Sequence, residues 1–307
     1  MQGLIFGFIV SYIFLKVSIP FLLIHAPDKP NKRSSHTTIK ASSGGISFIF
    51  STLLFAFLQN DIQWFMCLPL AVIGIIDDRV KLSAKLRYLA QLLTVILILK
   101  NTLFLNEQLI TFQDYFIFIF LLIFGTAIIN FSNFMDGIDG LLAGCFFLII
   151  IFASLTFNLT LFSLCGSLLA FLIFNWQPAK VFMGDVGSTF LGALLVLILY
   201  NQATIYDSFR NLLIALPIFS DALVTVLRRF YLRQNIFKAH KSHLFQRLHQ
   251  SGWSHSKISA IYIFLTCLMF FSVYINQISI MILSSIISIF VGTILELKFA
   301  APFKESI

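Results

Sequence analysis

Long apolar stretches alternate with short polar connections along the whole chain. A helix of ~20 apolar residues spans the hydrocarbon core of a bilayer, and several of these stretches approach that length. Eleven of them can be marked, covering residues 3–24, 44–58, 62–76, 86–99, 115–129, 141–157, 160–174, 188–200, 211–227, 258–275 and 278–295. The pattern predicts an all-α, polytopic membrane protein that forms a single domain, residues 1–307, with about eleven crossings and ten as the alternative.

The composition strengthens this prediction. Hydrophobic residues make up 59% and charged residues 11% of the chain, whereas soluble domains carry roughly 45–50% and about 25%. These values exclude a soluble globular enzyme, a disordered chain, a nucleic-acid-binding module and a secreted disulfide scaffold. We therefore expect the membrane, and no nucleic acid, as a partner; the sequence leaves open whether two copies form a homodimer.

The basic residues are divided unequally between the two sides that eleven crossings define. One side receives eighteen of the 21 Lys and Arg residues, whereas Lys100 and Arg210 fall on the other and Lys16 lies within the first stretch. Cytoplasmic connections of membrane proteins carry such an excess of positive charge. We therefore predict an inner-membrane protein with its N-terminus outside and its basic side in the cytoplasm.

Four polar clusters fall on this same basic side: Asp77–Asp78, 130–140, 184–188 and the histidines from His240 to His255. This one-sided placement favours an active site that faces the cytoplasm over a pore. A membrane transporter is one alternative, although the inverted repeats of many transporters are not evident. A prenyl-transferring membrane enzyme with aspartate-rich motifs is the other alternative.

The first cluster places two adjacent carboxylates at the end of an apolar stretch. Asp77 and Asp78 repel each other, which is costly unless a cation or a chemical task is involved. Lys85 follows at the start of the next stretch. The alternative is a solvated helix end that Arg79 and Lys81 neutralise.

The second cluster offers oxygen ligands at helical spacing. Asn133, Asp136 and Asp139 are three residues apart, so a helical turn would present them on one face. Gly137 would let a ligand approach the backbone closely. Oxygen donors suit Mg²⁺, or Mn²⁺, rather than zinc; an ordinary turn or a calcium-like loop is the alternative.

The last two clusters are suited to anions. We expect Gly187 and Ser188 to cap a helix whose N-terminal amides face an anion, with Asp185 available for a metal. The connection 228–257 contains His240 and His243 but no acidic residue. It is suited to bind phosphates, or alternatively anionic lipid.

Asp221 lies within the ninth apolar stretch, seven residues before Arg228 and on about the same helix face. We expect it to be a paired, buried carboxylate rather than a catalytic one. Oxygen ligands for a divalent cation and a basic, histidine-bearing connection meet on one membrane side, which is the equipment of phosphoryl transfer. The membrane location implies that one substrate is a lipid.

At these clusters the chain resembles the polyprenyl-phosphate N-acetylhexosamine-1-phosphate transferases. The resemblance runs from about Asp28 to Gln246 in the motif order of the family, and rests on the strings IIDDRVKLSAKLRYLAQ, NFSNFMDGIDGLLAG and VFMGDVGS. It implies transfer of a sugar 1-phosphate from a UDP-sugar to undecaprenyl phosphate, with release of UMP and with Mg²⁺ as the cofactor (Mn²⁺ as an alternative).

The resemblance also implies a role for each matching residue. Asp185 would bind the metal with Asn133 nearby, Asp77 and Asp78 match the paired aspartates, and Lys85 would contact phosphate. The remaining matches are Asp136 and Asp139 as catalytic carboxylates, Gly137 to Asp139 beside the nucleotide, Phe182 beside the uracil, and His240 and His243 on the diphosphate.

Two further strings resemble one branch of this family. RSSH, residues 33–36, and AHKSHLFQ are similar to enzymes that initiate O-antigen or capsule chains. That branch implies a UDP-N-acetyl sugar, an N-acetylhexosamine or a deoxy-amino sugar, as the donor. The proline- and arginine-rich stretch that commonly precedes the first glycines of the family is replaced by KASSGG, residues 40–45.

Overall fold

The computed structural model describes residues 1–30, 38–102, 111–236 and 240–303. RSSH therefore lies outside the described residues. Helices dominate this part of the chain, and one two-stranded antiparallel ribbon joins residues 27–28 to 40–41. The elements in chain order are α1 (Gln2–His25), β1 (Pro27–Asp28), β2 (Lys40–Ala41), α2 (Ile46–Leu58), η1 (Ile62–Cys67), α3 (Leu68–Val80), α4 (Ala84–Lys100), α5 (Phe112–Phe134), α6 (Leu141–Thr156), η3 (Leu159–Leu161), α7 (Phe162–Asn175), α8 (Gly184–Tyr200), α9 (Ile205–Ile214), α10 (Leu216–Tyr231), α11 (Leu244–Gln250), α12 (His255–Ile275) and α13 (Ile278–Lys298).

Each apolar stretch marked in the sequence coincides with helical structure, which confirms an all-α, membrane-embedded protein. Among the described residues, four helices are long and apolar enough to cross a bilayer, namely α1, α5, α12 and α13. The pair α9 and α10 makes a fifth candidate if it is counted as one broken span. Shorter apolar helices make up much of the rest, so the count of eleven crossings stays a prediction.

The prediction of one continuous helix over 211–227 is wrong. The chain breaks at Ala215, and α10 leaves α9 at an angle of 82°. Pro217 lies in the first turn of α10, where a missing backbone N–H costs nothing, whereas a helix continuing from α9 would lose a hydrogen bond there. The bend turns α10 and its polar residues away from the direction of α9.

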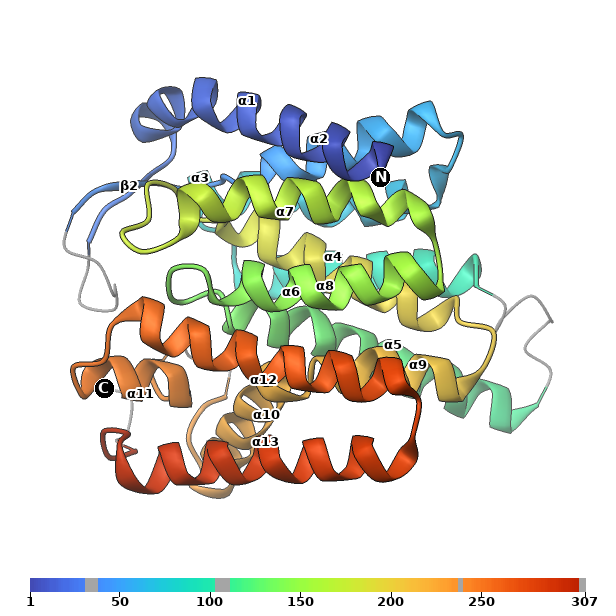
Figure 1. Cartoon of the computed structure of the whole chain (residues 1–307). Helices are drawn as coiled ribbons and strands as arrows, with labels where there is room; N and C mark the ends of the chain where they lie inside the picture. The colour runs from blue at the N-terminus through green and yellow to red at the C-terminus, as the bar shows by residue number, and fades with distance from the viewer. Residues whose placement is uncertain (31–37, 103–110, 237–239, 304–307) are drawn as a thin grey trace.

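Helix α8 lies in the interior of the bundle and α1 at its edge (Figure 1). Every residue of α8 from Val186 to Tyr200 is buried, as expected for a helix that is apolar all round. Helix α1 instead exposes Ile5, Ile9 and Ile13 along one face, which is the face available to lipid. Because α8 contacts α2, α3, α4 and α5, its first turn is fixed relative to the ends of these helices.

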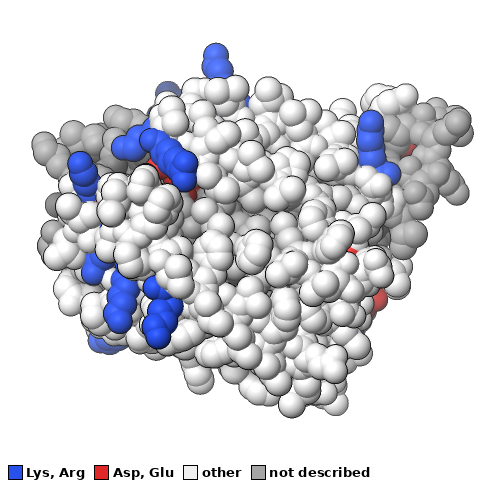
Figure 2. Space-filling view, turned by 90° about the horizontal axis from the view of Figure 1, so that it is seen from above, with Lys and Arg blue, Asp and Glu red and all other residues white. Residues whose placement is uncertain are grey.

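The two ends of the bundle differ in charge. Figure 2 shows most of the visible Lys and Arg side chains at one end, with an almost uncharged surface between that end and the other. This is the end at which α11 lies and α13 finishes, whereas α1 begins at the opposite end (Figure 1). The bundle thus has one basic end and a broad apolar belt, the arrangement that a bilayer requires.

Candidate active site

Close packing of α3 against α8 brings the first and third polar clusters, Asp77–Asp78 and 184–188, together. A Cβ atom added at Gly74 would lie 2.3 Å from the Cα of Val186, so only glycine permits this approach. Gly184 has a φ of +75° and starts α8 directly beside Asp78; a Cβ atom there would lie 2.2 Å from Asp78 Oδ2. The sequence thus folds so that the paired aspartates face the first turn of α8.

Asp78 is hydrogen-bonded to the loop before α2 and to α8. Its Oδ2 accepts from Ser43 Oγ at 2.6 Å, and its Oδ1 accepts from the backbone N–H of Asp185 at 2.9 Å. Ser43 belongs to the KASSGG segment, in which the chain departs from the pattern of the family that it resembles. Ser43 therefore donates a hydrogen bond to Asp78 from a segment in which this chain differs from that pattern.

Asp77 is joined to Asp185 through an arginine. Its Oδ1 accepts from the N–H of Leu82 at 2.5 Å, and its Oδ2 lies 3.2 Å from Arg87 Nη1. The same Arg87 nitrogen lies 3.2 Å from Asp185 Oδ2. The two neighbouring aspartates therefore contact Asp185 differently. Asp78 accepts from its backbone N–H, whereas Asp77 is linked to its side chain through Arg87.

Asp136 completes this group from the turn after α5. Burial, together with the nearby carboxylates of Asp78 and Asp139, raises the pKa of Asp136 to about 7. At neutral pH a carboxyl group with this pKa is divided between its protonated and ionised forms. We refer to Asp77, Asp78, Asp136 and Asp185 as the acidic centre.

Asn133 lies beside the first turn of α8. Its Oδ1 accepts from Ser188 Oγ at 2.7 Å, which places the amide one turn from Asp185. The expected cap by Gly187 and Ser188 is wrong, because α8 begins at Gly184 and both residues lie inside the helix. Asp185 itself occupies the first turn, where the helix dipole favours a negative charge.

The donor chemistry of the acidic centre fits a hard divalent cation. Arg87 is paired with Asp77 and Asp185, Asp78 lies near Asp185, and Asp136 lies near Asp78. Oxygen atoms of carboxylates and of Asn133 are the ligands that Mg²⁺ and Mn²⁺ prefer. Within the described ranges no three acidic, imidazole or thiol groups already lie at metal-ligand spacing; Arg87 instead lies between Asp77 and Asp185.

Asp139, three residues after Asp136, has different partners. Its Oδ1 lies 3.1 Å from His255 Nδ1 and its Oδ2 accepts from the N–H of Ala179 at 3.1 Å. Ser259 Oγ donates to its backbone carbonyl at 2.7 Å. Its carboxylate therefore holds the turn against α12 and the 176–181 loop, and a catalytic role for Asp139 stays a prediction.

The basic connection 228–257 contains a short helix, α11, that the sequence did not predict. Asp221 on α10 accepts from the first two amides of this helix, those of Leu244 and Phe245, at 2.7 and 3.1 Å. His243 directly precedes α11, and its ring centroid lies 5.0 Å from that of His240. The buried, paired state of Asp221 is confirmed, but Arg228 pairs with Glu296 instead.

Burial, together with the neighbouring His243 and Arg229, lowers the pKa of His240 to about 3. The ring is therefore neutral near pH 7 in the free protein, and its Nδ1 accepts from the N–H of Ser242 at 3.3 Å. An anion bound beside it would reverse this effect by favouring the charged imidazolium.

The histidine loop, by which we mean residues 240–245 with the start of α11, packs against the chain on both sides of Asp136. The ring of Phe245 packs against Gly137, where an added Cβ atom would lie 2.7 Å from the ring. The ring centroid of Phe134 lies 5.7 Å from that of His243. Since both contacts flank Asp136, the structure brings Asn133, Asp136, Gly137 and the histidine loop into one region.

Lys85 and Phe182 lie on neighbouring segments. Lys85 is exposed in the first turn of α4, two residues before Arg87. Phe182 is half-buried; its N–H donates to Ala41, and its carbonyl accepts from Gly44, both beside Ser43. The structure thus places both residues next to segments that contact the acidic centre, whereas their contacts with substrate stay predictions.

Three contributors were not expected to act at the site. Arg87 bridges two aspartates, Ser43 binds Asp78, and Asp221 holds the histidine loop. Arg87 lies two residues after Lys85 in the string KLSAKLRY, so its closeness in sequence to the paired aspartates could have predicted this contact. The partners of Ser43 and Asp221 are distant in the chain and left no signal in the spacing.

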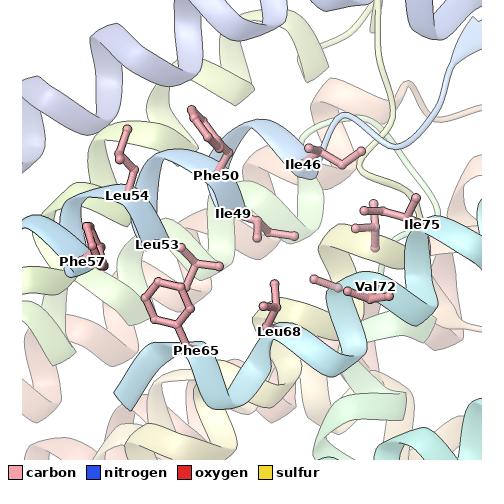
Figure 3. A pocket seen from close by; sticks show the side chains of 12 residues that line it. Ile46, Ile49, Phe50, Leu53, Leu54, Phe57, Phe65, Leu68, Val72 and Ile75 are labelled. Carbon is pink, nitrogen blue, oxygen red and sulfur yellow. The ribbon is translucent and has the colours of Figure 1, made fainter. Parts of the chain in front are cut away.

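A cavity of about 420 Å³ lies elsewhere, between α2 and α3 (Figure 3). Apolar side chains such as Ile49, Leu53, Phe65 and Val72 point into it. A cavity with this lining offers no group that would hold or neutralise a phosphate. The chemistry therefore belongs to the acidic centre and the histidine loop.

Clustered carboxylates and a histidine loop at the basic end of an apolar bundle define a membrane-embedded phosphotransferase. The profile of the Glycosyl transferase family 4 matches residues 61–202. The chain is 31% identical to the probable undecaprenyl-phosphate N-acetylglucosaminyl 1-phosphate transferase of Bacillus subtilis (strain 168), over 86% of this chain and 82% of that protein.

Two further relatives are similar over most of their lengths. The phospho-N-acetylmuramoyl-pentapeptide-transferase of Listeria innocua is 26% identical over 82% of this chain and 90% of the relative. The undecaprenyl-phosphate alpha-N-acetylglucosaminyl 1-phosphate transferase of Thermotoga maritima is 28% identical over 72% of each. The chain therefore belongs to the polyprenyl-phosphate N-acetylhexosamine-1-phosphate transferase family, which excludes the transporter and prenyl-transferase alternatives.

Proposed function

We propose that the enzyme transfers an N-acetylhexosamine or deoxy-amino sugar 1-phosphate from a UDP-sugar to undecaprenyl phosphate and releases UMP. The observation that carries the proposal is the packing of the histidine loop beside Asp136 of the acidic centre. A divalent cation at the carboxylates and imidazoles beside it would neutralise the diphosphate of the donor from two sides. The names of the relatives support the lipid acceptor and make N-acetylglucosamine the first sugar to test.

Mg²⁺ is the proposed cofactor, held by Asp185 with Asn133 nearby. Bound there, it would supply charge neutralisation of the donor phosphates. Asp77 and Arg87 would orient Asp185, while Asp78 fixes the start of α8. Lys85 would contact phosphate from its exposed position, and Phe182 would lie beside the uracil.

Undecaprenyl phosphate, the proposed acceptor, does not need a general base to become a nucleophile. A phosphate monoester has a second pKa near ~6, so its oxygen is mostly ionised at neutral pH and can attack the sugar-bearing phosphorus directly. Asp77 and Asp78 are each held by two hydrogen-bond donors, which disfavours them as covalent nucleophiles. We expect inversion at phosphorus in a chiral-phosphate experiment; retention would support a phospho-aspartate intermediate instead.

The reaction is proposed to take place at the cytoplasmic face of the inner membrane. The support is the concentration of Lys and Arg at the end of the bundle that contains α11 (Figure 2). The product is proposed to prime an envelope polysaccharide such as an O-antigen chain. AHKSHLFQ favours this role, and the cell-wall enzymes among the relatives form the competing assignment.

The test is sugar transfer in membranes that contain the protein. Radiolabelled UDP-sugars are supplied one at a time with undecaprenyl phosphate and Mg²⁺, and labelled lipid and released UMP are measured together. We expect equimolar lipid product and UMP with one N-acetyl sugar donor, and neither product with EDTA. Absence of labelled lipid with every UDP-sugar, in membranes where the protein is folded, would contradict the proposal.

A further inference from the structure

We propose that Asp221 is a positioning residue: it fixes His243 and the start of α11 so that the histidine loop presents its imidazole to the donor phosphates. The inference rests on the proposed function for the identity of the ligand. Asp221 has no contact with the acidic centre among the described residues, so any role in the reaction must be indirect.

Asp221 is bonded to three separate parts of the chain. Its two oxygens accept from the N–H groups of Leu244 and Phe245 at the start of α11. Tyr262 Oη on α12 donates to Oδ2 at 2.8 Å, and Thr225 Oγ1 on α10 itself donates to Oδ1 at 3.3 Å. A carboxylate with this many donors is stabilised as the ion and rigid in position.

His243 faces the same carboxylate. Its Nδ1 lies 3.7 Å from Asp221 Oδ1, and both side chains are buried. A carboxylate on this side holds the Nδ1–H toward itself, and Nε2, when it too carries a proton, can donate to a phosphate oxygen. Asp221 thus determines both where the imidazole lies and which nitrogen is available.

The other end of α11 is held separately. Arg247 bonds to Glu296 on α13 and donates to the carbonyl of Ala301 at 2.9 Å. Because the far end of α11 has this independent attachment, loss of Asp221 should release the start of α11 without detaching the whole helix. A point substitution can therefore test positioning apart from overall folding.

The first test is a double-mutant cycle on steady-state transfer. We expect Asp221→Asn to lower kcat/KM for the UDP-sugar about 30-fold and His243→Ala about 100-fold, with the KM for undecaprenyl phosphate unchanged. Because Asp221 acts through His243, the double variant should be no worse than His243→Ala. Losses that multiply to roughly 3000-fold would overturn the proposal.

Thr225→Val is the matched control. It removes one hydrogen bond from the same buried cluster but leaves the contacts of Asp221 with α11 and His243 in place. We expect kcat/KM within about twofold of wild type. A loss as large as that of Asp221→Asn would mean that the cluster supports activity only through stability, which would overturn the proposal.

The second test does not depend on the reaction. Amide hydrogen exchange over 240–250 is compared between the wild type and Asp221→Asn in lipid nanodiscs. We expect about tenfold faster exchange at the start of α11 in the variant and unchanged exchange in α12. Unchanged protection at Leu244 and Phe245 would overturn the positioning role, whereas an inactive wild type with the expected exchange would refute only the proposed function.

Discussion

The acidic centre and the surroundings of Asp221 contain buried carboxylates that are neutralised to very different extents. Asp221 alone accepts four hydrogen bonds and faces an imidazole. In the acidic centre, Asp77 and Asp185 share one guanidinium, and burial and two neighbouring acids raise the pKa of Asp136. A carboxylate whose hydrogen bonds are all made within the protein stabilises the fold. A group of carboxylates with too few donors and cations is suited to bind a ligand that supplies them.

The largest expected effect comes from removing a carboxylate of the acidic centre. Asp78→Ala should lower transfer roughly 1000-fold, because the start of α8 loses its partner and the site loses a charge. Asp207→Ala, in the first turn of α9 beyond the far end of α8, is the control and should leave transfer unchanged. Steady-state assays on both variants would contradict this role if Asp78→Ala stayed within tenfold of wild type.

Removal of the fully hydrogen-bonded carboxylate, Asp221, should affect stability most. Asp221→Ala leaves two amides and a tyrosine hydroxyl buried without an acceptor, which should lower the free energy of unfolding by about 3 kcal/mol. Unfolding in detergent, followed by circular dichroism, measures this loss. A change below about 0.5 kcal/mol would mean that water replaces the carboxylate at no cost.

Arg87 links the two aspartates that it touches. Arg87→Gln removes the shared charge, and we expect kcat/KM to fall about 30-fold because Asp185 loses its fixed orientation. Arg79→Gln removes the same charge from an exposed neighbour and should cost less than about threefold. Equal losses in the two variants would show that net charge, rather than the Arg87 bridge, matters.

The smallest expected effect is the pH dependence that Asp136 contributes. Its pKa of about 7 lies above the ordinary value of ~3.9, so the folded protein binds more protons than the unfolded chain between those limits. Stability should therefore fall as pH rises from about 4 to about 7. Asp136→Asn removes this penalty, and its stability relative to wild type should rise by about 1.4 kcal/mol from pH 6 to pH 8.

This comparison is made without divalent cations, with EDTA present, because a bound cation would favour the ionised carboxyl group. Unfolding curves at the two pH values are sufficient. A stability difference between Asp136→Asn and wild type that does not change with pH would show that Asp136 titrates in its ordinary range.

The sequence predicted the helices better than the contacts between them. Runs of apolar residues marked each helical stretch, and the clusters around Asp77, Asp136 and Asp185 were expected to meet. The bend at Ala215 was missed because Pro217 falls inside an apolar run, and α11 was missed because seven residues carry too little periodicity.

The partners of individual carboxylates were the least predictable feature. Asp136 and Asp139 share one short motif, yet one faces Asp78 and the other His255. Asp221 was expected to be paired and is, but three of its four hydrogen-bond donors lie 23 to 41 residues later in the chain. Such partners depend on how helices pack, which the local sequence does not encode.

The most direct test of the account compares wild type and Asp185→Ala for Mg²⁺-dependent sugar transfer and thermal stability in the same preparation. We predict that the variant loses transfer at every Mg²⁺ concentration while its stability is equal or higher, because one of four crowded carboxylates is gone. Retention of more than about a tenth of the wild-type activity at saturating Mg²⁺ would contradict Asp185 as the metal ligand and the acidic centre as the site of reaction.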